Sequence, residues 1–129
     1  MSQLDAFENL QAWRSSMDLV LRIYALTDRF PRSELYGLSG QLRRAGVSIP
    51  ANIAEGNARL STAAYLNHVQ IALGSLGELR TLVEIAVRLH YVQAEERLTV
   101  ARQLSEVGRL LYGLRTALKS RLDRHQKEP

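Results

Sequence analysis

The residue types from which most metal and acid–base sites are built are sparse in this chain of 129 residues. It has three histidines and no cysteine, so a thiolate zinc site, a cysteine nucleophile and a disulfide are excluded. A di-iron site in a helical bundle would need Glu-x-x-His pairs. The residues three positions before His68, His90 and His125 are Tyr65, Val87 and Leu122, and none of them is acidic. We therefore interpret His68 and His90 as structural residues at or near the surface.

Motifs for zinc, nucleotide or acyl chemistry do not occur either. The sequence has no His-x-x-x-His pair, no G-x-x-x-x-G-K-S/T phosphate loop, no G-x-G-x-x-G and no G-x-S-x-G. We expect a protein that is not an enzyme and that needs no metal or other cofactor.

The basic residues offer a different chemistry, which is the binding of phosphate. The chain has 17 basic against 13 acidic residues, and all the basic ones except Lys119 and Lys127 are arginine. Residues 97–127 hold 8 basic and 2 acidic residues, so most of the positive charge lies near the C-terminus. Six of these residues are expected on the side of one helix opposite its apolar stripe, as candidate nucleic-acid contacts. They are Arg97, Arg102, Arg109, Arg115, Lys119 and Arg124. The alternative is a solvated surface that happens to use arginine.

A second polar pattern lies in the middle of the chain. Six residues step by three or four positions, which places them on one helix face beside an apolar stripe. They are Gln41, Arg44, Ser48, Asn52, Glu55 and Arg59. Arg44 and Glu55 are three turns apart, about 16 Å, so they cannot pair with each other. Ser75 and Glu78 are candidate partners, and we predict a polar network inside the bundle or between subunits. A solvated face is the equal alternative.

The apolar spacing is helical throughout and predicts helices over residues 10–29, 34–58, 62–90 and 94–124. Asn9, Ser33 and Ser61 are the expected N-caps of the first three. Pro50 lies inside the second helix, where we expect a kink. Residues 125–129 should fray. Helices of this length with short loops predict a single all-α domain over residues 1–129, folded as an antiparallel up-down-up-down four-helix bundle.

Two of the predicted helices carry more apolar surface than one core needs. Helix 10–29 has one stripe of Leu10, Trp13, Met17, Val20 and Tyr24, and another of Leu19, Ile23, Leu26 and Phe30. Helix 62–90 has one stripe of Leu66, Val69, Leu73, Leu76, Val83 and Val87, and another of Ile71, Leu82, Ile85 and Leu89. The extra stripes indicate deep burial or contact with another subunit. Gly74 and Gly77 each cost ~1 kcal/mol in a helix, which predicts a backbone packed closely against them.

Three segments of the sequence resemble a known family. They are Phe7-Glu8-Asn9-Leu10 with Trp13, the run from Phe30-Pro31 through Tyr36-Gly37-Leu38 to Asn52-Ile53-Ala54-Glu55-Gly56 and Arg59, and Gly74-Ser75 with Glu78-Leu79. Over about residues 7–122 the chain resembles the 23S rRNA-intervening sequence proteins, also called four-helix bundle proteins. Gly46 and Gly77 depart from the bulkier residues usual there.

The resemblance implies a left-handed antiparallel four-helix bundle, and ring-shaped homopentamers are known in the family. The family name describes where some members are encoded, inside ribosomal RNA genes, and not an activity. Accessory proteins of diversity-generating retroelements are also similar, and they form basic pentameric barrels that bind a reverse transcriptase and nucleic acid.

Two functions remain open from the sequence. The first is a homo-oligomeric scaffold, with a pentamer favoured, that binds RNA or DNA through its basic surface. The second is a protein–protein interaction module without a nucleic-acid role. Binding to a membrane surface is disfavoured, because the bundle core already uses the non-basic face of the last helix. Residues 1–5 lack the pattern of a signal peptide and no apolar run approaches ~20 residues, so we expect a cytoplasmic protein.

Overall fold

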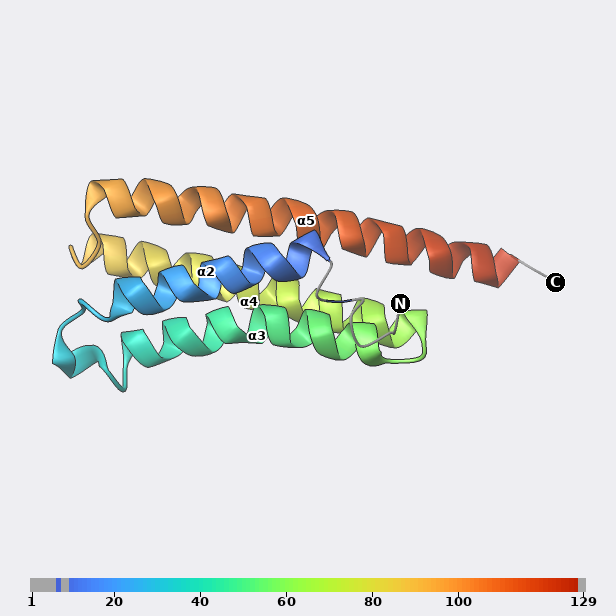
Figure 1. The fold of residues 1–129 in the computed structure, drawn as a ribbon, viewed down its shortest axis with the longest axis horizontal. Coiled ribbons are helices and arrows are strands. Elements are labelled where there is room, and N and C mark those ends of the chain that lie inside the picture. The colour runs from blue at the N-terminus through green and yellow to red at the C-terminus, as the bar shows by residue number, and fades with distance from the viewer. Residues whose placement is uncertain (1–6, 8–9, 128–129) are drawn as a thin grey trace.

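The computed structural model describes residue 7 and residues 10–127, with side chains up to Arg124. Its long helices are α2 (Gln11–Thr27), α3 (Leu38–Ala58), α4 (Thr62–Arg88) and α5 (Ala94–Lys127), and the short 3₁₀ helix η2 (Arg32–Glu34) precedes α3. The described residues contain no strand. The predicted all-α four-helix bundle is confirmed (Figure 1).

The four helices pack around one apolar core. Each of α2 and α4 contacts α3 and α5, while α2 and α4 do not contact each other, so these two occupy diagonally opposite corners. The α2–α3 and α4–α5 connections lie at one end of the bundle and the α3–α4 connection at the other (Figure 1). The largest fully buried side chains come from all four helices and include Leu19, Ile23, Leu42, Ile49, Ile53, Val69, Leu79, Val100, Leu111 and Leu118.

The helix starts differ in part from the expected caps. Ser61 is confirmed as the cap of α4, because its side chain accepts a hydrogen bond from the Ala64 N–H at 3.0 Å. Ser33 is not a cap: it lies in η2, and α3 begins four residues later than predicted. Asn9 lies outside the described residues, and the N-cap of α2 is Leu10, which makes no side-chain cap bond.

Glu34 takes the role that was expected of Ser33. One carboxylate oxygen accepts a hydrogen bond from the Leu38 N–H at 3.3 Å, at the first turn of α3. The other oxygen accepts from the Tyr91 hydroxyl at 3.0 Å, in the α4–α5 connection. Tyr91 also packs against Phe30, with ring centroids 5.3 Å apart. Glu34 and Tyr91 therefore join the two connections at this end of the bundle.

The helix ends are set by local geometry that periodicity does not contain. α2 stops at Thr27, two residues before its predicted end, and Pro31 follows soon after. α4 stops at Arg88 because His90 adopts a φ of 63°, the left-handed conformation. The His90 N–H then donates to the Val87 carbonyl and the Tyr91 N–H to the Ala86 carbonyl, both at 3.0 Å, which is a Schellman motif. α5 continues through Lys127, beyond its predicted end at 124.

The closest approach between helices lies at Gly56 rather than at the two glycines of α4. A Cβ on Gly56 would lie 2.7 Å from the His68 Cβ, so only glycine fits where α3 crosses α4. At Gly74 and Gly77 a Cβ would meet no described atom of another helix within 4 Å. The prediction that another backbone packs closely against these two glycines is therefore wrong for contacts within the chain. Pro50 lies inside the unbroken helix α3. The kink at Pro50 and the left hand of the bundle stay predictions.

Candidate functional site

The middle of the polar stripe on α3 faces α4 and forms a connected set of hydrogen bonds. The hydroxyls of Ser48 and Ser75 lie 2.8 Å apart across the two helices. The Asn52 amide donates to the Ser48 hydroxyl at 3.1 Å and to the Ser48 carbonyl at 2.9 Å. Its Oδ1 lies 2.9 Å from His68 Nδ1. Since Asn52 Oδ1 can only accept, His68 donates from Nδ1.

His68 is the member of this polar seam that the sequence did not identify. It precedes Ser75 by seven residues, about two turns, so both side chains lie on the same side of α4. That spacing was a usable signal. The missing information was the register between α3 and α4, which Gly56 fixes by allowing His68 to pack directly against the α3 backbone.

The remaining members of the stripe point away from this seam. Glu55 and Arg59 pair with each other at the surface, with Arg59 Nη2 2.9 Å from Glu55 Oε1. Gln41, Arg44 and Glu78 are exposed, and their side chains form no hydrogen bond or ion pair with any described residue. A pair of surface charges such as Glu55 and Arg59 contributes little to stability.

The extra apolar stripes are exposed on the diagonally opposite helices α2 and α4. On α2 the stripe with Leu19, Ile23, Leu26 and Phe30 is buried, so the other stripe is the surplus one. We define the α2 stripe as Met17, Val20 and Tyr24, of which Val20 is half-buried and the others are exposed. The α4 stripe consists of the exposed Ile71 and Ile85 and of Leu89, which directly follows α4; Leu82 from the predicted set is buried.

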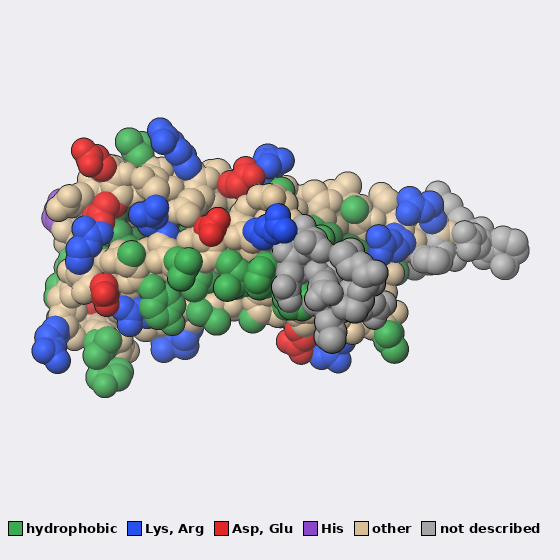
Figure 2. All heavy atoms as spheres, viewed as in Figure 1, with side chains coloured by type: hydrophobic (Ala, Val, Ile, Leu, Met, Phe, Trp, Pro, Cys, Tyr) green, Lys and Arg blue, Asp and Glu red, His purple; other side chains and the backbone are tan. Residues whose placement is uncertain are grey.

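Hydrophobic side chains gather where α2 and α3 lie side by side (Figure 2). The exposed Val47 adds to this face from α3. Arg43 ties the two helices together there, because its guanidinium lies 4.8 Å from the Tyr24 ring centroid and its Nε donates to the Thr27 hydroxyl at 2.9 Å. Asp28 lies 3.6 Å from Arg43. This face is thus an apolar surface that contains one cation, Arg43, whose charge is balanced by Asp28.

The six basic candidates on α5 do not share one side of the helix. Arg97 lies 3.6 Å from Glu84 on α4, and Arg115 is only half-exposed. The predicted position opposite the core is wrong for these two. They are 18 residues apart, which is about five whole turns, whereas Arg102 and Arg109 are rotated from them by about 120–140°.

The charges of these cations are balanced to different degrees. Glu106 binds Arg109 through both carboxylate oxygens, at 2.7 and 3.2 Å. This pairing holds the pKa of Glu106 below and the pKa of Arg109 above their ordinary values. Four of the six form no ion pair or hydrogen bond with a described residue; they are Arg102, Arg115, Lys119 and Arg124.

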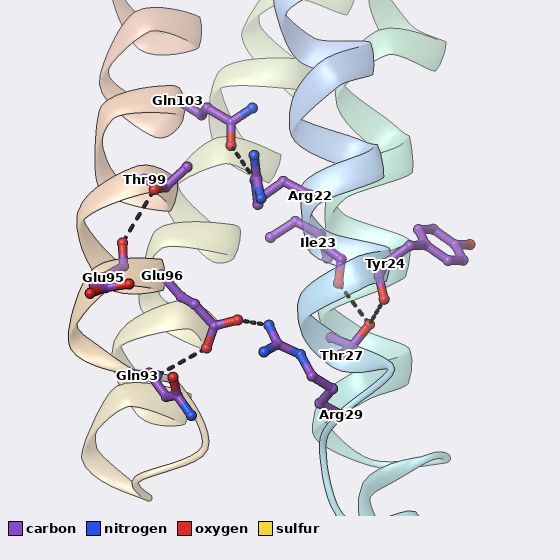
Figure 3. A network of polar contacts seen from close by, with 10 residues as sticks. All are labelled: Arg22, Ile23, Tyr24, Thr27, Arg29, Gln93, Glu95, Glu96, Thr99 and Gln103. Atoms are coloured by element: carbon purple, nitrogen blue, oxygen red, sulfur yellow. Dashed lines mark hydrogen bonds and ion pairs between the residues drawn. The ribbon is translucent and has the colours of Figure 1, made fainter.

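The side of α5 that faces α2 is occupied by contacts within the chain (Figure 3). Arg29 pairs with Glu96, which also accepts a hydrogen bond from the Gln93 N–H at 3.1 Å. Arg22 Nε donates to Gln103 at 3.2 Å. Arg22 of α2 and Arg29, which follows α2, are therefore engaged by α5 and are less available for phosphate.

Two tyrosines have raised pKa values for different reasons. Burial raises the pKa of the Tyr65 phenol, against the lowering effects of its hydrogen bond from Asn57 and of the charge on Arg121. The hydrogen bond to Glu34 raises the pKa of Tyr91. Both shifts favour the neutral phenol, and both residues stabilise contacts between helices or connections.

Within residues 10–124 no group of three histidine, aspartate or glutamate side chains could hold a metal ion. The hollows on the surface are open, and the one between α4 and α5 has about 210 Å³ and is lined by Arg80, Glu84, Arg97 and Ser105 among others. No described helix is long and apolar enough to cross a membrane.

Comparison with known proteins connects this geometry to a family. A family model described as 23S rRNA-intervening sequence protein matches residues 8–113. A search of curated proteins gives no match. A crystal structure from Bacteroides thetaiotaomicron VPI-5482, described as a protein with unknown function from the S23 ribosomal protein family, is 27% identical. The similarity covers 81% of this chain and 97% of that one, with a TM-score of 0.75. This chain belongs to the family of 23S rRNA-intervening sequence proteins.

Proposed function

We propose that this protein is a non-enzymatic subunit of a cytoplasmic homo-oligomeric ring that binds nucleic acid through α5. The observation that carries the proposal is the exposure of apolar stripes on diagonally opposite helices, α2 and α4. A ring requires two different faces on each subunit, because the contact is head-to-tail. The α2 stripe and the α4 stripe are such a pair, and contact between them would bury apolar surface that the monomer leaves in water.

The glycines of α4 support the same arrangement. Gly74 and Gly77 are exposed, and a Cβ at either position would meet no described atom within 4 Å. Each costs about 1 kcal/mol relative to alanine, and the isolated subunit gains nothing in exchange. A helix from a neighbouring subunit could approach this part of α4 closely. The family resemblance favours five subunits.

The nucleic-acid part of the proposal rests on the cations that have no carboxylate partner. Arg115, Lys119 and Arg124 follow one another along the second half of α5, with only Asp123 among them as an acid. A formal charge of +4 on each of five chains would give the ring +20. Phosphate binding by such a surface would depend strongly on salt and weakly on sequence.

The second candidate is a protein–protein interaction module without a nucleic-acid role. The observation in its favour is that Arg97 and Arg109 are already engaged by Glu84 and Glu106. In that case the α2 and α4 stripes would still assemble the protein, and the arginines would keep the assembly soluble.

Light scattering in solution tests the assembly. We expect a mass of several subunits, and we expect Met17→Glu or Ile85→Glu to lower that mass, because a charge would be buried in the contact. Leu60→Glu is the matched control: Leu60 is 97% exposed at the end of α3 and should tolerate the charge. A monomeric protein, or an unchanged mass in both stripe variants, would rule out this ring.

A salt titration of binding to short RNA and DNA separates the two functions. We expect binding at about 50 mM salt, with log K falling linearly with log salt. Arg115→Glu with Lys119→Glu should reduce the slope by about 1.4 for a single strand and leave the mass unchanged. Arg32→Glu with Arg59→Glu changes the net charge equally at other sites and should have a smaller effect. Absence of binding would leave the protein–protein module as the function.

A further inference from the structure

We propose that Tyr112 is a stacking platform for a base of single-stranded RNA; this rests on the proposed nucleic-acid function and names its substrate class. Tyr112 is the aromatic residue on α5 and is 56% exposed. Its side chain forms no hydrogen bond or ring contact with a described residue. An exposed aromatic face beside cations is the arrangement by which single-strand binders hold a base and its phosphate.

Two cations lie on the same side of α5 as Tyr112. Arg115 and Lys119 follow it by three and seven residues, so the three side chains are successive neighbours along the helix surface. Arg115 and Lys119 are also four residues apart, and such a like-charge pair destabilises a helix by about 0.2–0.5 kcal/mol. No described carboxylate forms an ion pair with Arg115 or Lys119 that would offset this repulsion. A bound phosphate would relieve it.

A third cation reaches this place from α4. Arg80 Nη2 donates to the Leu104 carbonyl at 3.1 Å, and no described carboxylate pairs with it. Gly108 gives the guanidinium room, since a Cβ there would lie 3.0 Å from Arg80 Nη2. Gly108 precedes Tyr112 by four residues, about one turn, so Arg80 is held in position on the same side of α5. Arg80 also lines the hollow of about 210 Å³ between α4 and α5.

The chemistry around Tyr112 favours RNA over other occupants. A protein partner would be expected to find apolar neighbours, but the neighbours here are cations and the hydroxyls of Ser105 and Thr116. Both hydroxyls are exposed and form no hydrogen bond with a described residue, so they are available to a ribose 2′-OH. A duplex hides the faces of its bases, whereas a single strand presents them to an aromatic ring.

The test compares a single-stranded RNA of about 15 nucleotides, the same RNA in a duplex, and the corresponding single-stranded DNA, by fluorescence anisotropy at about 50 mM salt. We expect the wild type to prefer single-stranded RNA. Tyr112→Ala should weaken that binding by about 5- to 150-fold, leave duplex binding unchanged and keep the salt slope, because stacking releases no counterions. Tyr112→Phe should retain the affinity. Tyr36→Ala is the matched control, since Tyr36 is 94% exposed beside η2.

Four results would overturn the inference, and they differ in whether they also refute the proposed nucleic-acid function. Wild-type binding that Tyr112→Ala does not weaken refutes the platform and leaves the nucleic-acid function standing. Equal affinity for single-stranded DNA refutes the assignment to RNA. A lower mass for Tyr112→Ala would instead place Tyr112 in a contact between subunits. No binding of the wild type to any of the three probes refutes the nucleic-acid function together with the platform.

Discussion

Gly56 is the position where one methyl group should damage the bundle most. A Cβ there would lie 2.7 Å from the His68 Cβ, 2.9 Å from Tyr65 Cδ1 and 3.3 Å from the Tyr65 carbonyl oxygen. The His68 Cβ and the carbonyl belong to the α4 backbone or are fixed to it, so no side-chain rotation removes these overlaps. The helices would have to separate by roughly 1 Å to restore a carbon–carbon distance of about 3.5–4.0 Å.

The cost of Gly56→Ala follows from these contacts. Overpacking of a close contact costs about 1–3 kcal/mol. Separation of the helices would also stretch the 2.9 Å contact between Asn52 Oδ1 and His68 Nδ1, a hydrogen bond with a net value of about 1 kcal/mol. Alanine returns about 1 kcal/mol because it is the better helix former. We therefore expect the free energy of unfolding to fall by about 1–3 kcal/mol.

Urea denaturation followed by circular dichroism measures this effect. Gly74→Ala is the matched control, because a Cβ there meets no described atom within 4 Å. It should raise the free energy of unfolding by about 1 kcal/mol if the subunit is alone. In an assembly that buries Gly74, the same variant should lower the mass instead. If Gly56→Ala is as stable as the wild type, α3 and α4 do not pack as closely as these distances require.

Three further predictions concern the polar seam, the end of α4 and the tyrosine at the connections. Asn52→Ala should lower the free energy of unfolding by about 1–2 kcal/mol, since His68 and Ser48 lose their partner. Arg44→Ala, at an exposed residue, should change the free energy of unfolding by no more than about 0.5 kcal/mol. Equal losses for Asn52→Ala and Arg44→Ala in urea titrations would contradict this contrast. His90→Gly should raise the free energy of unfolding by about 1 kcal/mol, and with it the melting temperature, because His90 holds a φ of 63°. An unchanged or lower melting temperature would refute this prediction. The raised pKa of Tyr91 means that the folded state keeps a proton which the unfolded chain loses near pH 10.0, so stability should fall as the pH rises above 10.0. Tyr91→Phe should reduce that fall, and identical slopes between about pH 9 and about pH 11 would speak against it.

Periodicity predicted the helices of this protein well because each one carries a long apolar stripe. The helix boundaries depended on single contacts instead. Ser33 has the right chemistry for a cap, but Glu34 reaches the Leu38 N–H from within a 3₁₀ turn. Similarly, His90 ends α4 in the left-handed conformation, a role for which glycine would be the usual signal. A propensity scale does not distinguish such alternatives, since both satisfy the same backbone groups.

The polar stripe shows the limit of spacing within one helix. Spacing identifies which side chains share a face, and Ser48 and Asn52 do lie together. It does not show which neighbouring helix meets that face, nor at what height. Ser75 and His68 meet the stripe at two different levels of α4, whereas Arg44 extends beyond it into solvent. Removing the partner of a buried charge is strongly destabilising, but Arg44 and Glu55 are exposed, so that cost does not apply to them.

The two parts of the proposed function occupy different sides of the molecule and should be separable. Ile71 and Arg80 both belong to α4, but nine residues rotate a helix by about 180° net, so they point in opposite directions. A neighbouring subunit seated at Ile71 would therefore leave Arg80 open, whereas Ile85 lines one surface hollow together with Arg80. If assembly instead covered α5, the like charges of Arg115 and Lys119 would be buried without an ion pair to any described carboxylate, at a high desolvation cost. Variants of the α2 stripe or the α4 stripe should thus disperse the ring while each monomer still binds nucleic acid weakly. Variants of Arg115 and Lys119 should leave the ring intact and weaken its binding to nucleic acid.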